Sequence, residues 1–506
     1  MTTQRRVLVA TISASSAGLL MQTVVVAIPA IQRSLNSTAI EALWVANVSL
    51  LFLGALILVG GALGDLYGRE RVFLWGVVGF MLTCVLCAVA PDVTTLIIAR
   101  ALHGVAGALM VPNSLAILSA SFEGEERAKV IGTWSSTTTL ASAVGPILGG
   151  FLVDVGAWRA LFLLGVPFTL VTLWAMRGAV GAQTTPKLKN SLPPLDALGA
   201  GLVTLSLAAF VYSAMRLGQT SIGDALVWGA LGVGVLSALA FVAVEARAAY
   251  PILPLALFRS RVFSGANLYT FFIYSALVGV TTFATIYLVS VRDFSATTAG
   301  VAFLPVTVAI VALSPTSGRW AGRVGARPLL VLGGVLVGVG TLGIASIPLT
   351  DAPPDYLISY FPFIALFGVG LSLLIAPLTN SVMSAVPQES AGVASGVNYA
   401  VARSAGALAT AVLGAMLIFA FTSTLDALAR PALDDSTYSA LMAQSAFLLE
   451  AQVPFVSAEV GARIADFKRE AYHTAFIALM IACALMSWVG AGIAYATVGT
   501  RKTQEA

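Results

Sequence analysis

The sequence predicts an all-α membrane protein that crosses the bilayer fourteen times, and three observations lead to that fold class. Of its 506 residues, 58% are hydrophobic and only 10% are charged, whereas a typical soluble protein is about 25% charged. Its mean hydropathy is +0.94. The apolar residues form continuous runs of the ~20 residues that a span needs, without the alternation of a β-barrel strand, so helices are expected.

Fourteen apolar runs supply the predicted spans. The first is too long for a cleaved signal sequence and has no evident Ala-x-Ala processing site, so we expect it to remain as span one. The long segment 422–471 mixes apolar and charged residues, and we expect short amphipathic helices there, forming a solvated loop or a substrate lid over the outer mouth. The runs cover residues 7–31, 44–65, 72–91, 94–119, 128–153, 158–178, 195–216, 224–246, 263–289, 297–319, 327–348, 356–383, 391–421 and 472–498.

The distribution of basic residues predicts the orientation. With an even number of spans both termini lie on one side, and the short loops of that side hold 17 Lys and Arg residues. The opposite short loops hold four, which are Arg33, Arg159, Arg216 and Arg292. Because basic loops stay on the cytoplasmic side, both termini are expected in the cytoplasm of a plasma (bacterial inner) membrane. The net charge of +4 reflects this bias and not nucleic-acid binding.

Several function classes find no support in the residue inventory. The chain has two His, no nucleophile–base spacing and no G-x-x-x-x-G-K-[ST] motif, so an enzyme or an ATP-driven pump is not expected. Cys84, Cys87 and Cys483 lie inside apolar runs and are expected to be small core residues, so no metal site or disulfide is predicted.

The stretch Gly61–Arg71 (GALGDLYGRER) predicts a tight, charged turn between two spans. Taken alone it could be an ordinary basic loop. The stretch resembles the loop between spans two and three of the major facilitator superfamily, where it implies a cytoplasmic latch between two halves of a transporter. The matching residues are Gly61, Asp65, Gly68, Arg69 and Arg71.

A second copy of this stretch predicts two related halves. Gly318–Arg327 repeats the glycine interval, with Gly322 in the place of Asp65. The resemblance implies a major facilitator fold of two six-helix bundles, 1–178 and 261–506. The linker and two inserted helices in 179–260 resemble the extra pair of the fourteen-span drug:proton antiporters.

Span five carries a third resemblance. Its Gly-Pro-x-x-Gly-Gly core, made by Gly145, Pro146, Gly149 and Gly150, is similar to the motif of the antiporter branch. Small residues allow helices to approach closely, and the proline removes a backbone donor and kinks the span. The resemblance implies a tight seam between the halves.

Polar residues inside the spans are the candidates for substrate and proton coupling. Span four resembles the family motif, with Arg100 in place and His103 where Gln is usual; at i and i+3 they share a face. Arg100 could instead only bond backbone carbonyls, and Gln22 only a neighbouring helix. Span one resembles the family signature without its acid. The candidates are Gln22, Thr23, Arg100, His103, Asn380, Asn398 and Arg403.

The charge inventory suggests how coupling would work. All 23 acidic residues fall in loops or at span ends, so the titrating group expected in the interior is His103, with Asp65 and Asp154 as alternatives. Arg100 would sense the proton and hold the substrate electrostatically. Unbalanced cations should favour anionic or zwitterionic cargo over cations.

Together these features predict a secondary active transporter that exports small amphipathic drugs or metabolites, in exchange for protons. A proton gradient would supply the energy without a cofactor, and a monomer in the bilayer is expected. The alternatives are a proton-independent facilitator or lipid exporter of the same fold, and a membrane sensor or scaffold that transports nothing.

Overall fold

The computed structural model describes residues 3–122, 124–177, 196–217, 223–249, 251–350, 355–387, 391–451, 453 and 456–499. Within these ranges the chain is helical with short connections and contains no strand. Thirteen helices are long and apolar enough to cross a membrane. Helix α6 (Gly124–Asp154), whose apolar part is Val144–Asp154, supplies a fourteenth crossing. The predicted fold class is therefore confirmed.

Each predicted span coincides with one helix or with two or three consecutive helical segments. The first six spans are α1 (Thr3–Leu20) with the 3-10 segment η1 (Met21–Ala27) and α2 (Ile28–Leu35), α3 (Ala39–Tyr67), α4 (Arg69–Val89), α5 (Val93–Ser121), α6, and η2 (Trp158–Leu164) with α7 (Gly165–Met176). The inserted pair is α8 (Ala197–Leu217) and α9 (Ala225–Glu245).

The remaining spans follow the short segment η3 (Leu255–Arg259). They are α10 (Arg261–Ser290), α11 (Ala296–Ala302) with α12 (Leu304–Val324), α13 (Ala326–Ala345), α14 (Tyr356–Ser359) with α15 (Phe361–Ser384), α16 (Ala391–Ala429) and α18 (Ala458–Thr497). The outer segment adds α17 (Asp435–Ala443) and η5 (Ser445–Glu450). We call α1–α7 the first half and α10–α18 the second half.

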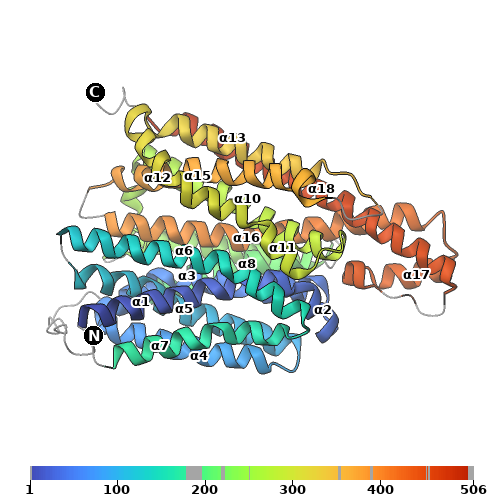
Figure 1. The fold of residues 1–506 in the computed structure, drawn as a ribbon, viewed down its shortest axis with the longest axis horizontal. Coiled ribbons are helices and arrows are strands. Elements are labelled where there is room, and N and C mark those ends of the chain that lie inside the picture. Colours follow the sequence, from blue (N-terminus) through green and yellow to red (C-terminus); the bar gives the residue numbers. More distant parts are fainter. Residues whose placement is uncertain are drawn as a thin grey trace.

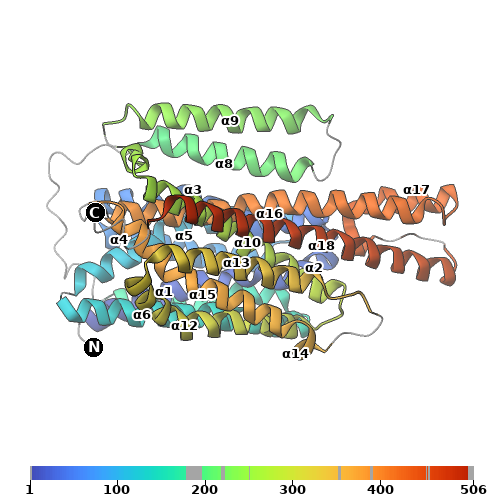
Figure 2. The ribbon, with the colours of Figure 1, turned by 90° about the horizontal axis from the view of Figure 1, so that it is seen from above.

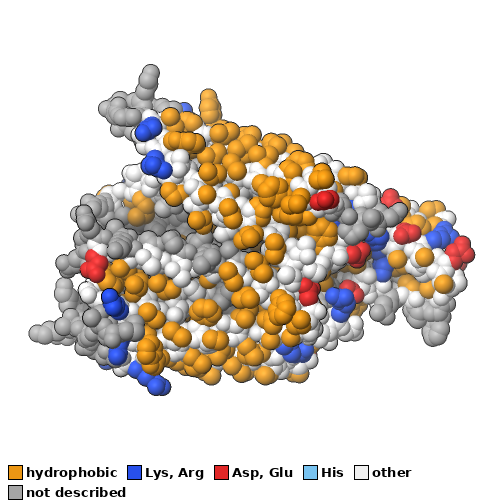
Figure 3. Space-filling model, viewed as in Figure 1, with side chains coloured by type: hydrophobic (Ala, Val, Ile, Leu, Met, Phe, Trp, Pro, Cys, Tyr) orange, Lys and Arg blue, Asp and Glu red, His pale blue; other side chains and the backbone are white. Residues whose placement is uncertain are grey.

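The long helices run roughly parallel, with α17 protruding at one end (Figure 1). We call that end the far face, and the opposite end, where α1 begins and α18 ends, the terminal face. On the side shown in Figure 3, charged side chains gather towards the two ends and the described surface between them is mainly hydrophobic. Such a band is what a helix bundle presents to lipid.

The inserted pair lies along one flank of the molecule, with α9 outermost (Figure 2). Helix α8 contacts both α3 of the first half and α16 of the second half. Two buried serines of this pair bond to carbonyls of the neighbouring helix, Ser206 to Gly234 and Ser213 to Val227. The pair therefore covers the junction of α3 with α16.

The stretch Gly61–Arg71 is less of a turn than its sequence predicts. Helix α3 continues to Tyr67 and α4 begins at Arg69, so the change of direction occurs at Gly68 alone, whose φ is +94°. The corresponding turn of the second half occurs at Gly325, with φ +87°. Both angles favour glycine, so the repeated glycine interval marks equivalent turns. The Asp65 side chain lies outside the described part, and the latch stays a prediction.

The close packing of α3 on α5 depends on Gly60 and Gly64, and not on the motif residue Gly61 between them. A Cβ at Gly60 would lie 2.0 Å from the carbonyl oxygen of Ala108, and one at Gly64 would lie 1.8 Å from Oδ1 of Asn113. The Asn113 amide donates to the Gly60 carbonyl at 2.8 Å. Gly61 has only Pro112 nearby, at 3.9 Å.

The outer segment 422–471 differs from the predicted row of short helices. Helix α16 extends into it as far as Ala429 and α18 already begins at Ala458, so only α17 and η5 are short helices of its own. Asp434 caps α17, and donation from Ser436 and Thr437 holds the pKa of the Asp434 carboxyl well below its usual range.

Candidate functional site

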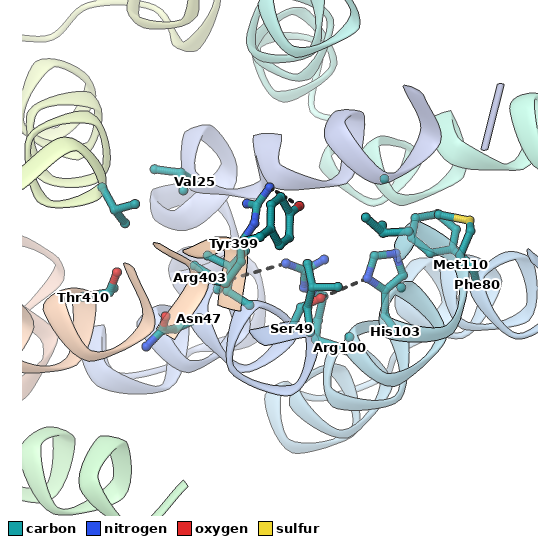
Figure 4. A pocket seen from close by; sticks show the side chains of 18 of the residues that line it. Val25, Asn47, Ser49, Phe80, Arg100, His103, Met110, Tyr399, Arg403 and Thr410 are labelled. Carbon is teal, nitrogen blue, oxygen red and sulfur yellow. Dashed lines mark hydrogen bonds between the residues drawn. The ribbon is translucent and has the colours of Figure 1, made fainter. Parts of the chain in front are cut away.

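A cavity of about 310 Å³ lies between the two halves. Helices α1, α3, α4, α5 and α6 with segment η1 contribute from the first half, and α10 and α16 from the second half. Its wall is mostly apolar and aromatic, with few polar groups. Among the described residues that line it, none carries a carboxylate. Three lining residues, Arg100, His103 and Arg403, have basic side chains (Figure 4).

Arg100 is bound to the backbone of α3. It is 2% exposed, its Nε donates to the carbonyl of Val45 at 2.9 Å, and Nη2 lies 3.5 Å from the carbonyl of Ala46. These contacts are those expected if Arg100 only bonds the backbone carbonyls of a neighbouring helix. Because Arg100 lines the cavity, its positive charge is close enough to act on a molecule bound there.

His103 lies one helical turn from Arg100 and is 4% exposed. Its Nδ1 shares a hydrogen bond of 3.0 Å with the hydroxyl of Ser49, and its ring packs on Phe80 with the centroids 4.0 Å apart. In the described part of the chain Nε2 has no hydrogen-bond partner. Ser49 therefore fixes the ring and leaves Nε2 as the nitrogen available for a proton or a ligand.

Arg403 enters the cavity from the second half. Its Nη2 donates to the Tyr399 hydroxyl at 2.6 Å, and its guanidinium lies 4.8 Å from the centre of the Tyr399 ring. Arg403 is only partly buried. Arg403 thus differs from Arg100, because it donates to a side chain of its own helix and Arg100 donates to the backbone of α3.

Helices α3 and α16 join the halves beside the cavity. The Asn47 amide donates to the carbonyl of Ala407 at 2.7 Å. A Cβ at Gly54 would lie 3.0 Å from the Cβ of Arg403 and 3.2 Å from the backbone nitrogen of Ser404. The backbones are therefore close enough that Gly54 has no room for a larger side chain without movement.

The other coupling candidates lie away from this cavity. Thr23 lines a neighbouring cavity of about 230 Å³, and the Gln22 side chain lies outside the described part. Asn398 donates to Asn267 at 3.1 Å and Thr270 at 2.7 Å, which ties α16 to α10. Asn380 is exposed on α15. Neither asparagine lines a described cavity.

Two of the four residues of the predicted seam, Pro146 and Gly150, meet the second half near the far face. A Cβ at Gly150 would lie 2.4 Å from the carbonyl oxygen of Ala296, and one at Gly300 the same distance from that of Pro146. Gly149 faces Thr23 and Leu161 within its own half, and Gly145 is buried.

Asp154 holds the same contact between the halves. At the end of α6, its carboxylate accepts hydrogen bonds from the backbone nitrogens of Ala296 and Thr297 at 2.8 and 2.9 Å, and from the Thr297 hydroxyl. It caps the N-terminus of α11 from the other half of the protein, where a helix dipole favours a negative charge.

Two residues of the site, Asn47 and Ser49, and one buried arginine outside it are not evident from the sequence. Asn47 and Ser49 are small polar residues in an apolar run, and nothing local shows that they face a cavity. Arg292, predicted in an outer loop, is 1% exposed and donates to the carbonyls of Ile347 and Pro348 at 3.0 and 2.6 Å. It therefore lies in the predicted loop, between α10 and α11, but as a buried charge.

Comparison with known proteins places this architecture in a family. A family model described as Major Facilitator Superfamily matches residues 10–410. The tetracenomycin C resistance and export protein of Streptomyces glaucescens is 32% identical over 394 residues, which cover 78% of this chain and 72% of that protein. The multidrug efflux pump LfrA of Mycolicibacterium smegmatis is 30% identical over 473 residues, or 92% and 91% of the two chains.

A solved structure shows the same fold. It is a bacterial homologue of the human lysosomal transporter Spinster in an inward-facing, unoccupied conformation, with a TM-score of 0.64, 15% identity and 99% of both chains covered. Combined with the family match over most of the chain, the helix arrangement and the cavity between the halves lead to one assignment. This chain is a multi-pass membrane transport protein that belongs to the major facilitator superfamily.

Proposed function

We propose that this protein exports small amphipathic drugs or metabolites by alternating access, in exchange for protons, with both termini in the cytoplasm. The observation that carries the proposal is the cavity of about 310 Å³ between the halves. A mostly apolar wall with a few polar groups is typical of sites for small organic ligands. The relatives named as export and efflux proteins support the outward direction.

The contacts between α6 and α11 are expected to open and close during this cycle. They join the halves near the far face, through the close approach of Gly150 to Ala296 and the capping of α11 by Asp154. Cargo bound in the cavity would leave at that face only after these contacts separate. Rocking of the two halves about a central site is the motion expected for such folds.

Arg403 is the residue proposed to bind an acidic group of the cargo. It lines the cavity and is partly exposed, whereas Arg100 is buried with two of its nitrogens near carbonyls of α3. Without a carboxylate among the described lining residues, a negative group on the cargo would balance the charge. The cargo class expected is therefore anionic or zwitterionic.

An Arg403→Gln variant tests this assignment. Loss of a charge-assisted hydrogen bond of about 1.5–3 kcal/mol should raise the KM for anionic cargo about 10- to 100-fold and change that for neutral cargo little. Arg430→Gln is the matched control, because the Arg430 side chain is 72% exposed at the end of α16, outside the cavity. Equal effects of R403Q on anionic and neutral cargo would contradict the assignment.

His103 is the residue proposed to carry the proton, at Nε2. A neutral His103 can accept a hydrogen bond at Nε2 from a hydroxyl or ammonium group of the cargo, whereas a protonated His103 cannot. Proton and cargo would then exclude each other, which is the linkage that exchange requires. A zwitterion would satisfy both partners, with its acidic group on Arg403 and its donor on His103.

Substitution of His103 by Gln, which can hydrogen-bond but does not titrate, tests the proton step. In proteoliposomes H103Q should lose export driven by a pH gradient while exchange of labelled for unlabelled cargo continues. His473→Gln is the control, because His473 bonds to Tyr287 and does not line the cavity. Unchanged gradient-driven export by H103Q would show that another group carries the proton.

The second candidate function is a proton-independent facilitator or lipid exporter of the same fold. The lack of a carboxylate among the described lining residues favours it, because the resemblance implies that a buried carboxylate commonly carries the proton. Transport by the unmodified protein, measured with and without an imposed pH gradient, separates the two candidates. Equal rates would favour the facilitator.

A further inference from the structure

The segment η5 (Ser445–Glu450) in the outer region is inserted between the two halves. Leu448 is 6% exposed. Phe447, Leu448, Leu449 and Glu450 line a small cavity of about 20 Å³ together with residues of α2 and α3 from the first half and of α10, α16 and α18 from the second half. An amphipathic loop lying on the surface would not contact both halves in this way.

The place of this insertion is the path from the main cavity to the far face. On α3, Asn47 lines the main cavity and Leu43 lines the small one. On α10, Thr282 lines the main cavity and Ile286 lines the small one. Each pair is four residues apart, so η5 lies about 6 Å, or one helical turn, beyond the main cavity.

Lys468 of α18 holds the segment in place. Its ammonium donates to the carbonyl of Leu449 at 2.8 Å and to that of Ala451 at 2.9 Å. These are carbonyls at the C-terminal end of η5, where a cation is stabilising. The nitrogen Nε of Arg33, at the end of α2, lies 3.8 Å from the Glu450 carboxylate, which adds a weaker contact to the first half because both side chains are partly exposed.

The backbone of the segment is strained at its buried residue. Leu448 has φ 54° and ψ −120°, a conformation that side chains with a Cβ rarely adopt. Such a conformation persists only where the surroundings impose it. Here the surroundings are the two halves on either side of the Leu448 side chain.

We propose that Ser445–Glu450 is a plug that closes the far exit of the cavity, that Lys468 is its positioning residue, and that the plug withdraws when the far face opens. This proposal rests on the alternating-access function proposed above. Withdrawal removes Leu448 from between the halves and releases the strained backbone conformation, so the plug can reverse its position in each cycle.

A cross-link between plug and first half tests the proposal. In full-length protein with Cys84, Cys87 and Cys483 replaced by Ser, the pair Arg33→Cys and Glu450→Cys is joined by a short, reducible thiol cross-linker. Export in proteoliposomes should fall at least tenfold on cross-linking and return on reduction. Export at the rate of the uncross-linked protein would overturn the proposal.

The matched control joins two outer residues of the second half. Arg430, directly after α16, and Tyr438 of α17 lie close, with the guanidinium 5.5 Å from the ring centre. Cross-linked Arg430→Cys/Tyr438→Cys should export normally, because this link leaves η5 unattached to the first half. Loss of export here as well would show that any constraint on the outer segment is harmful, and would also overturn the plug.

A labelling experiment tests the plug without measuring export. If no variant exported cargo, the proposed function would fail, but the labelling rates would still show whether the plug is present. Leu448→Cys should react slowly with a membrane-impermeant thiol reagent added at the far face, and at least fivefold faster when combined with Lys468→Met. Arg463→Met is the control, because Arg463, also on α18, donates to the Ala432 carbonyl outside the plug. Equal labelling rates in the K468M and R463M backgrounds would overturn the role of Lys468.

Discussion

Replacing Gly60 by Ala should destabilise the protein, whereas the same change at the adjacent Gly61 should not. The Cβ of an alanine at Gly60 would lie 2.0 Å from the carbonyl oxygen of Ala108 and 2.7 Å from its carbon. A C···O contact needs about 3.3 Å, so α3 and α5 would have to separate by roughly 1.3 Å. The added methyl at Gly61 would have only the Cβ of Pro112 at 3.9 Å, an ordinary contact.

The expected magnitude follows from these distances. Overpacking costs about 1–3 kcal/mol, and separation of the helices would weaken the bond from Asn113 to the Gly60 carbonyl, which is worth about 1 kcal/mol. The free energy of unfolding should therefore fall by about 2–4 kcal/mol in G60A. In G61A it should be unchanged or rise by up to about 1 kcal/mol, since Ala favours a helix.

Thermal unfolding of the purified protein in detergent, followed by circular dichroism at one heating rate, measures the difference. The midpoint of G60A should lie several degrees below that of the unmodified protein, with G61A at or above it. A midpoint for G61A as low as that of G60A would refute the reasoning. It would mean that the motif glycine at 61, and not the close contact at 60, sets the distance between α3 and α5.

Two further substitutions test contacts that the sequence does not reveal. Asp154→Ala removes the hydrogen bonds from α6 to Ala296 and Thr297 at the start of α11, and should shift the conformational equilibrium by about 1–2 kcal/mol towards opening at the far face. Thr297→Ala removes only one of these donors and should have a smaller effect. Spin-label distances between α6 and α11 measure the shift, and unchanged distances in D154A would contradict it. Arg292→Met leaves a buried carbonyl, of Ile347, and a part-buried one, of Pro348, without their donor and should lower the free energy of unfolding by about 2–4 kcal/mol. Arg159→Met, which removes one part-buried bond, should cost less, and equal thermal midpoints of the two variants would contradict the buried role of Arg292.

The spans could be predicted because the hydrophobic effect acts on each run separately. A continuous apolar run such as 72–91 must cross lipid as a helix whatever its neighbours are, and α4 covers Arg69–Val89. The pairing of Arg100 with His103 on one wall of the cavity could also be predicted, because residues three apart on a helix share a face.

Features that depend on contacts between distant segments could not be predicted. The bond from Asn47 to Ala407 joins residues 360 positions apart, and an asparagine in an apolar run gives no indication of its partner. Arg292 lies in a loop, as its position after a span predicts, but its burial depends on the carbonyls of Ile347 and Pro348 that follow α13. The burial of Leu448 likewise depends on the halves on both sides of it.

The inserted pair has a mechanical consequence for how the molecule can move. Because α8 contacts both α3 and α16, it joins the halves along one flank (Figure 2). On the opposite flank, where α6 and α12 lie, the halves meet through the contacts of α6 with α11 and α12. Packed helices slide past each other by only small amounts, so the flank joined by α8 should behave as the hinge line of the rocking motion. The largest displacement between the halves is then expected where α6 faces α11 and α12.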